Sequence, residues 1–210
     1  MSAINVGTDL RYEEGIENAK KSIALAREVG DLRAEVIARH SLVAGIYTMG
    51  GVYELQKESI SELLNAAKRL RDRMYMGIAY QQAGRFAMRQ GLISDARKFN
   101  ELVFAHRNGS GPNLLVLFHG AVIELESGNL GECQELIQRA AIFADAGSVD
   151  SFARANYAVI VARVAISTGD LSHIETAEKY ANDILDLSSV KLSILIRAEW
   201  TMESLAIHRE

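Results

Sequence analysis

Glycines that end apolar helical stretches recur along this chain at intervals of about forty residues. Gly50, Gly91, Gly128 and Gly169 are separated by 41, 37 and 41 residues. Glycine adopts the positive φ angle with which many helices end, because it has no Cβ to clash. Self-similarity at such a period is typical of stacked helical repeats, in which each repeat packs on its neighbours. The spacing predicts an all-α fold built from antiparallel helix pairs.

Positions counted from these glycines indicate how each pair packs. Seven residues before each glycine the side chain is small or modest, which allows a second helix to approach closely: Val43, Gly84, Ala121 and Ala162. Five, nine and twelve residues after the glycine, we expect the second helix to face its partner. Those positions hold Ala96, Asn100 and Val103; Cys133, Ile137 and Ala140; with three inserted residues, Ala177, Ala181 and Ile184; and with five inserted residues after Gly50, Ile60, Leu64 and Ala67.

The central stretch Met74–Asn108 resembles the tetratricopeptide repeat (TPR) family. Gly84 and Ala96 stand where that family favours Gly and Ala, and Gly91 stands at its turn between helices. These units are longer than the family's usual period of about 34 residues, and its aromatic positions are mostly aliphatic here. In this respect the chain is similar to the divergent long-repeat arrays of bacterial regulators. The resemblance, which covers nearly the whole chain, implies helix hairpins stacked as a right-handed α-α superhelix, a TPR-like solenoid.

The predicted repeats divide a single domain over residues 1–210. The chain opens on a second helix, at about residues 10–29, and closes on a first helix, at about residues 190–208. We therefore expect either a segment of a longer protein or a protein that self-associates through its terminal helices. The predicted units are a partial unit at 1–31, then 32–73, 74–111, 112–149 and 150–189, and a terminal helix at 190–210.

Composition narrows the classes of function. A net charge of −4 argues against a nucleic-acid-binding surface, which usually carries a basic bias. The basic cluster Lys68, Arg69, Arg71 and Arg73 is interpreted as the end of a helix, where cations complement the macrodipole. No signal peptide opens the sequence and no apolar run reaches the roughly 18 residues of a membrane span. We expect a cytoplasmic protein without a membrane partner.

Motifs for catalysis and for cofactor binding are missing from the sequence. It contains no HExxH, GxxxxGK[ST], GxSxG or CxxC motif. The five histidines are scattered, so no helical metal site is expected. Gly109-Ser110-Gly111 is interpreted as a loop between repeats, and Cys133 as a buried packing thiol. The sequence predicts no enzyme, no cofactor and no metal.

What remains is a surface along the first helices, which line the concave side of tetratricopeptide-like arrays. Its positions lie ten, six, three and two residues before each glycine. They hold His40, Ala44, Tyr47 and Thr48; Gln81, Arg85, Met88 and Arg89; Phe118, Val122, Leu125 and Glu126; and Val159, Arg163, Ile166 and Ser167. The predicted partner-binding residues are His40, Tyr47, Gln81, Arg85, Met88, Arg89, Phe118 and Arg163. The alternative interpretation assigns Met88, Phe118 and Leu125 to the core, and the arginines to solvent or to local carboxylates.

Three functions fit these observations in decreasing order. The first is a non-catalytic protein–protein or peptide interaction module, a scaffold or sensory segment of a bacterial regulatory protein. Its expected partner is acidic, because Arg85 and Arg89 share one helix face and Arg163 occupies the position of Arg85 two units later. The second is an intracellular sensor that binds a short peptide or small ligand in the concave groove. The third is an enzyme whose site carries no recognised motif.

Overall fold

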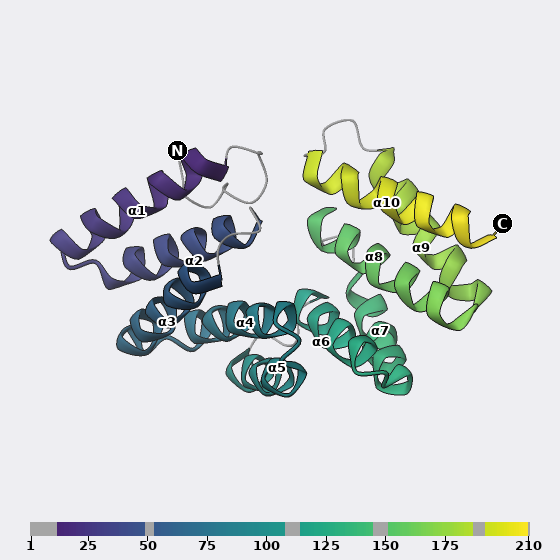
Figure 1. The fold of residues 1–210 in the computed structure, drawn as a ribbon, viewed down its shortest axis with the longest axis horizontal. Coiled ribbons are helices and arrows are strands. Elements are labelled where there is room, and N and C mark those ends of the chain that lie inside the picture. Colours follow the sequence, from purple (N-terminus) through teal and green to yellow (C-terminus); the bar gives the residue numbers. More distant parts are fainter. Residues whose placement is uncertain (1–11, 49–52, 108–113, 145–150, 187–191, 210) are drawn as a thin grey trace. The chain divides into compact units, whose positions relative to one another are not determined.

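The computed structural model describes residues 12–48, 53–107, 114–144, 151–186 and 192–209 (Figure 1). These residues form ten α-helices and no strand, which confirms the prediction of an all-α fold. The first and the last described helix lie within about two residues of the bounds predicted for them, 10–29 and 190–208. The helices are α1 (Tyr12–Glu28), α2 (Leu32–Thr48), α3 (Tyr53–Leu70), α4 (Arg73–Arg89), α5 (Ile93–Arg107), α6 (Leu114–Glu126), α7 (Leu130–Ala144), α8 (Ser151–Thr168), α9 (Leu171–Leu185) and α10 (Leu192–Arg209).

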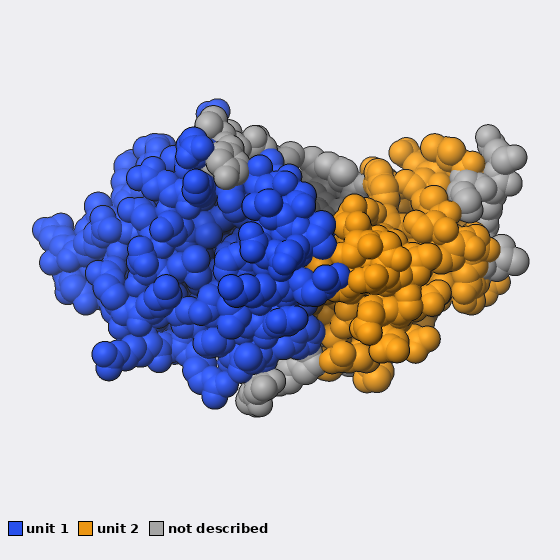
Figure 2. Space-filling view, turned by 60° about the horizontal axis from the view of Figure 1, so that its bottom comes forward, with its two compact units in different colours: residues 1–111 blue, residues 112–210 orange. Residues whose placement is uncertain are grey.

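The chain divides into two compact units, residues 1–111 and residues 112–210 (Figure 2). Unit 1 contains α1 to α5, and unit 2 contains α6 to α10. The boundary between them coincides with the predicted boundary between the repeats 74–111 and 112–149. A single domain over residues 1–210 stays a prediction.

Within each unit, helices that follow one another in the chain pack as pairs. In unit 1, α2 packs on α1 and α3, and α4 packs on α5, α3 and α2. In unit 2, α6 packs on α7 and α8, and α8 packs on α7, α9 and α10. Successive first helices therefore contact each other within each unit: α2 contacts α4 in unit 1, and α8 contacts both α6 and α10 in unit 2.

The glycines that were expected to end helices do so with positive φ angles. Gly91, Gly128 and Gly169 have φ values of 69°, 76° and 68°, whereas Gly50 lies outside the described residues. Gly30, which follows α1, also has a positive φ of 72°. After α4, the backbone N–H of Leu92 donates to the carbonyl of Ala87 at 2.9 Å, and that of Gly91 donates to Met88 at 3.0 Å. This pair of hydrogen bonds satisfies carbonyls that the end of a helix leaves without partners.

α4 and α5 lie close together at Gly84, where a small side chain was predicted and where an alanine would also fit. A Cβ at Gly84 would stand 3.4 Å from the Phe99 Cβ and 3.7 Å from the carbonyl oxygen of Ala96. Ten of the twelve predicted packing positions on the second helices of the four pairs are buried. The buried positions are Ile60, Ala67, Ala96, Val103, Cys133, Ile137, Ala140, Ala177, Ala181 and Ile184. The other two positions, Leu64 and Asn100, are half-buried.

Nine of these ten buried positions are at most 3% exposed, and Ile60 is 5% exposed. The predicted packing faces of the second helices are therefore confirmed.

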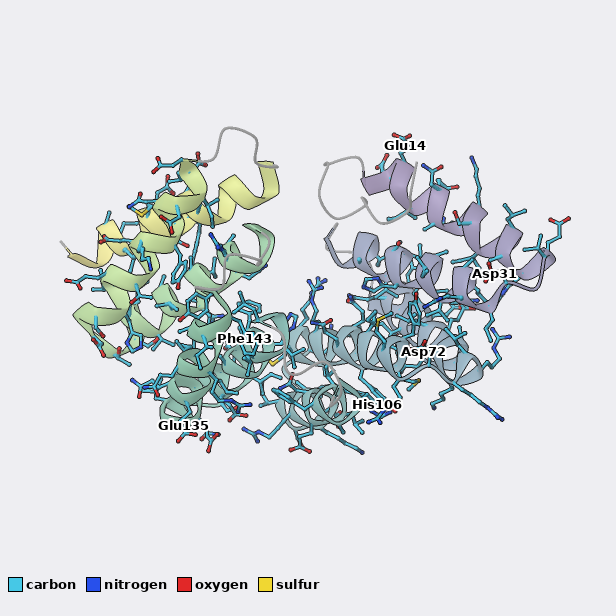
Figure 3. The ribbon with its side chains drawn as sticks, turned by 180° about the vertical axis from the view of Figure 1, so that it is seen from behind. Glu14, Asp31, Asp72, His106, Glu135 and Phe143 are labelled. Carbon is cyan, nitrogen blue, oxygen red and sulfur yellow. The ribbon has the colours of Figure 1, made fainter. Side chains whose placement is uncertain are left out.

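Aspartate side chains cap described helices, among them α4 and α9. The Asp72 side chain precedes α4 (Figure 3) and accepts hydrogen bonds from the backbone N–H groups of Met74 at 2.8 Å and Tyr75 at 3.3 Å. Asp170 accepts from the backbone N–H of Ser172 at 2.9 Å at the start of α9. These caps satisfy N–H groups that the first turn of a helix leaves without partners.

The basic cluster does not act as one helix end, which corrects the sequence interpretation. Lys68 and Arg69 lie in the last turn of α3, as expected. Arg71 has a φ of 56° in the turn, and Arg73 begins α4. The Arg73 Nη2 donates to the carbonyl of Ala105 at 2.8 Å, so this cation joins α4 to α5.

Candidate functional site

The predicted surface of the first helices is the candidate site, and we call its positions the first-helix strip. No described side chain in this strip is fully buried. The half-buried members are His40, Ala44, Gln81, Arg85, Met88, Phe118, Val122, Leu125, Val159, Arg163 and Ile166, and the exposed members are Arg89, Glu126 and Ser167. The side chains of Tyr47 and Thr48 lie outside the described residues, as does the loop at residues 109–111.

Other faces of the same helices are covered by their neighbours. Val43 of α2, Ala83 of α4, Leu117 of α6 and Ala162 of α8 are at most 3% exposed. A helix that is covered on most sides retains solvent access along one stripe. The strip is therefore the accessible side of the first helices, and Met88 and Phe118 belong to that side while also packing in part.

In unit 1 the strip contains a histidine held between two first helices. The Gln82 Nε2 of α4 lies 2.9 Å from the His40 Nε2 of α2, so the amide donates to the ring when the imidazole proton is on Nδ1. Burial lowers the pKa of His40 to about 4, and the positive charge of Arg85 adds to this shift. His40 is therefore a neutral acceptor at pH 7 rather than a cation.

We expect the His40 ring to titrate near pH 4 in the folded chain, against an ordinary value of 6.5. The unfolded chain then binds the proton more readily. The stability that the neutral ring supplies is complete above about pH 6.5 and is lost as the pH falls towards 4. Nitrogen NMR of the histidine rings over a pH titration measures this pKa. A histidine in a short, unstructured peptide serves as the reference. A folded-state pKa at or above 6.5 would contradict the burial of this ring.

The remaining unit 1 residues of the strip interact with other groups of the protein. Gln81, Arg85 and Arg89 each take part in a further hydrogen bond, ion pair, ring contact or electrostatic interaction. The charge of Arg85 acts on His40, as the lowered pKa of that ring records. This part of the strip is thus polar and positively charged, with Met88 as its apolar member.

In unit 2 the strip carries an internal ion pair, as in the alternative interpretation that assigned the arginines to carboxylates of the protein. Arg163 of α8 donates through Nη2 to the Glu126 Oε1 of α6, so a carboxylate already compensates this cation. The Phe118 ring lies edge-on to the His119 ring, with 5.1 Å between the centroids. Unit 2 therefore offers a mainly apolar strip, in contrast to unit 1.

A buried ionic cluster in unit 1 was missed by the sequence analysis. Glu35 of α2 is 3% exposed and accepts from the Nε of Arg39 at 2.9 Å, the Nε of Arg27 at 3.0 Å and the Nη2 of Arg69 at 2.8 Å. The Arg39 Nη1 also donates to the Glu62 Oε2 at 2.6 Å. The only sequence signal was the spacing of Glu35 and Arg39, four apart on one helix.

The ionic cluster joins α1, α2 and α3. Burial opposes ionisation of Glu35 most strongly, but hydrogen bonds from Arg39 and Arg27 and the charge of Arg69 outweigh it, so the pKa of Glu35 is lowered. Each buried charge therefore has a partner within the protein. We assign this cluster to the packing of unit 1 rather than to ligand binding.

Nucleophilic and metal chemistry find little support among the described residues. Cys133 is fully buried, and burial raises its pKa to about 11, so it is a protonated packing thiol at pH 7. Within the described ranges, no three His, Cys, Asp or Glu side chains are grouped so as to hold a metal ion. In the same part of the chain, every helix falls short of the length and apolarity of a membrane span.

Comparison of the sequence with protein-family models and with curated proteins finds no match.

Proposed function

We propose that this chain is a non-catalytic protein or peptide interaction module with a TPR-like superhelical arrangement, and that it serves as a scaffold or sensory segment of a bacterial regulatory protein. The incomplete burial of every described side chain in the first-helix strip carries this proposal. Support for the repeat architecture comes from the contacts between successive first helices and from the glycines with positive φ angles.

The strip has the chemistry of a recognition surface rather than of a reaction centre. Half-buried apolar side chains lose little conformational entropy when a partner covers them, and they contribute the apolar contact area of binding. Flanking polar groups provide orientation and specificity. The lowered pKa of His40 and the raised pKa of Cys133 leave both groups neutral at pH 7, in forms suited to packing.

For unit 1 we propose an acidic partner segment. Arg85 and Arg89 lie four residues apart on α4, and the field of Arg85 reaches His40. Guanidinium groups bind carboxylates through paired hydrogen bonds. The neighbouring Met88 side chain adds an apolar contact for the same partner. A carboxylate bound here would favour protonation of His40 and raise its pKa.

Selection from a phage-displayed random dodecapeptide library, with the full chain as the target, tests the proposed function. We expect acidic peptides among those selected. Replacing Arg85 and Arg89 together with alanine should weaken their binding at least tenfold, because each partly desolvated charged hydrogen bond contributes about 1–3 kcal/mol. Binding should also weaken as salt is raised, since exposed charges are screened over about 10 Å at 0.1 M.

The matched control replaces Lys68 and Lys98 with alanine. Both are exposed cations on second helices of unit 1, so the control makes the same change in net charge away from the strip. Circular dichroism melts of both double variants establish that they remain folded. Equal weakening by the two double variants would refute binding at the strip, and selection of no peptide of any composition would refute an interaction module.

A further inference from the structure

The two units carry opposite net charges. Residues 1–111 contain 16 Lys and Arg against 13 Asp and Glu, a net charge of +3, whereas residues 112–210 contain 7 against 14, a net charge of −7. The modest −4 of the whole chain conceals this difference. A partner whose charge is attracted to unit 1 is therefore repelled by unit 2.

The strip of unit 2 continues onto α10, beyond the positions that the glycine spacing marked. Ala198, Thr201 and Leu205 of α10 are all 0% exposed. They lie forty residues after Ala158, Val161 and Ala165 of α8, which are 0% exposed as well. The two helices thus bury equivalent positions.

The same offset of forty residues extends the strip. The strip positions of α8 are Val159, Arg163, Ile166 and Ser167, and the residues forty positions later are Glu199, Glu203, Ala206 and Ile207 of α10. All four of these α10 residues are exposed. Ile207 is 75% exposed, more than any other large apolar side chain described. Because α8 packs on both α6 and α10, the strip runs across three adjacent helices of unit 2.

This surface combines apolar and acidic groups. Its apolar members on α6 and α8 are half-buried, and its cation Arg163 is already bound to Glu126. Glu199 and Glu203 add two exposed carboxylates on α10. The resulting surface excludes an acidic segment and complements an apolar segment that carries Lys or Arg.

We infer that the α6–α8–α10 strip binds a protein segment of about six to eight residues that combines apolar side chains with Lys or Arg. This inference rests on the proposed interaction function and specifies a second partner chemistry, opposite to that of unit 1. Neighbouring helices lie about 8–10 Å apart, so three of them span roughly 20 Å. An extended peptide covers that length with about six residues.

Selection from the random dodecapeptide library, with the full chain as the target, also tests this inference. The measured quantity is the amino-acid composition of any peptides selected besides the acidic ones. We expect a group enriched in Lys or Arg together with aliphatic or aromatic residues. Replacing Glu199 and Glu203 together with lysine should weaken its binding at least tenfold, because charge reversal turns attraction into repulsion. Replacing Ile166 with serine should weaken the same peptides and leave acidic peptides bound at unit 1 unaffected.

The matched control replaces Glu135 and Glu175 with lysine. These exposed carboxylates belong to the second helices α7 and α9, and Glu135 is labelled in Figure 3. The control changes the charge of unit 2 by the same amount, and we expect less than a twofold effect on binding. Melting curves of both double variants verify folding.

Each other outcome decides against the inference. Equal losses in the two double variants would show attraction to the net charge of unit 2, without a site on the strip. Selection of acidic peptides alone would overturn the inference and leave the proposed interaction function standing. Selection of no peptides would overturn both.

Discussion

Replacing Glu35 with alanine is expected to lower the free energy of unfolding of unit 1 by about 3–5 kcal/mol. The substitution leaves Arg39, whose side chain is 3% exposed, without its buried carboxylate partner, so that the 44% exposed Glu62 has to compensate the buried cation. The pairs with Arg27 and Arg69 contribute less, because those side chains are 55% and 58% exposed and solvent screens them. Urea unfolding monitored by circular dichroism at pH 7 measures the loss.

Two controls identify the buried charge as the cause. Glu17 forms an exposed pair with Lys20, and replacing Glu17 with glutamine should leave the free energy of unfolding nearly unchanged, because solvent screens the pair. Replacing Glu35 with methionine and Arg39 with leucine together should restore much of the stability, because no uncompensated charge then remains buried. A double variant as unstable as the single one would contradict this explanation.

The same experiment has a defined pH dependence. The folded-state pKa of Glu35 lies below its ordinary value of 4.5, so the unfolded chain protonates first as the pH falls. The stability that ionised Glu35 supplies is complete above pH 4.5 and is lost as the pH falls through its lower folded-state pKa. The difference in free energy of unfolding between wild type and Glu35→Ala should therefore be constant from pH 5 upwards and should shrink as the pH falls below that.

Replacing Tyr157 with alanine is expected to destabilise unit 2 by about 3–5 kcal/mol. Tyr157 is 1% exposed and is the largest of the fully buried side chains among the described residues. Its ring meets that of Tyr180 edge to face, with 5.1 Å between the centroids, so truncation removes an aromatic contact and leaves a cavity between α8 and α9. Denaturant unfolding, followed by the fluorescence of Trp200 in the same unit, measures the loss.

Tyr157→Phe provides the matched control. The hydroxyl donates to the Ile137 carbonyl over a long 3.4 Å, so its removal should cost no more than about 1 kcal/mol. An equal loss in the two variants would assign the stability to this hydrogen bond rather than to ring packing.

Local sequence signals were sufficient to locate the helices. The turn glycines require a positive φ angle wherever they occur, and the apolar period of a helix is carried by its own residues. Helix bounds, the positive φ angles of Gly91, Gly128 and Gly169, and the burial of Cys133 could therefore be predicted. The accessible stripe also follows from this period, because neighbours cover the remaining sides of each first helix.

Pairings between helices could not be predicted in the same way. Arg163 and Glu126 are 37 residues apart, and Arg69 and Glu35 are 34 apart, so only the packing of α8 on α6 and of α3 on α2 decides that they meet. The continuation of the strip onto α10 likewise depends on which side of α10 faces α8. The sequence alone determined the helices, their turns and their small close-packing residues, because those depend on a few neighbouring residues. The tertiary structure alone decided which charges are buried and compensated, because that depends on the contacts between helices distant in sequence.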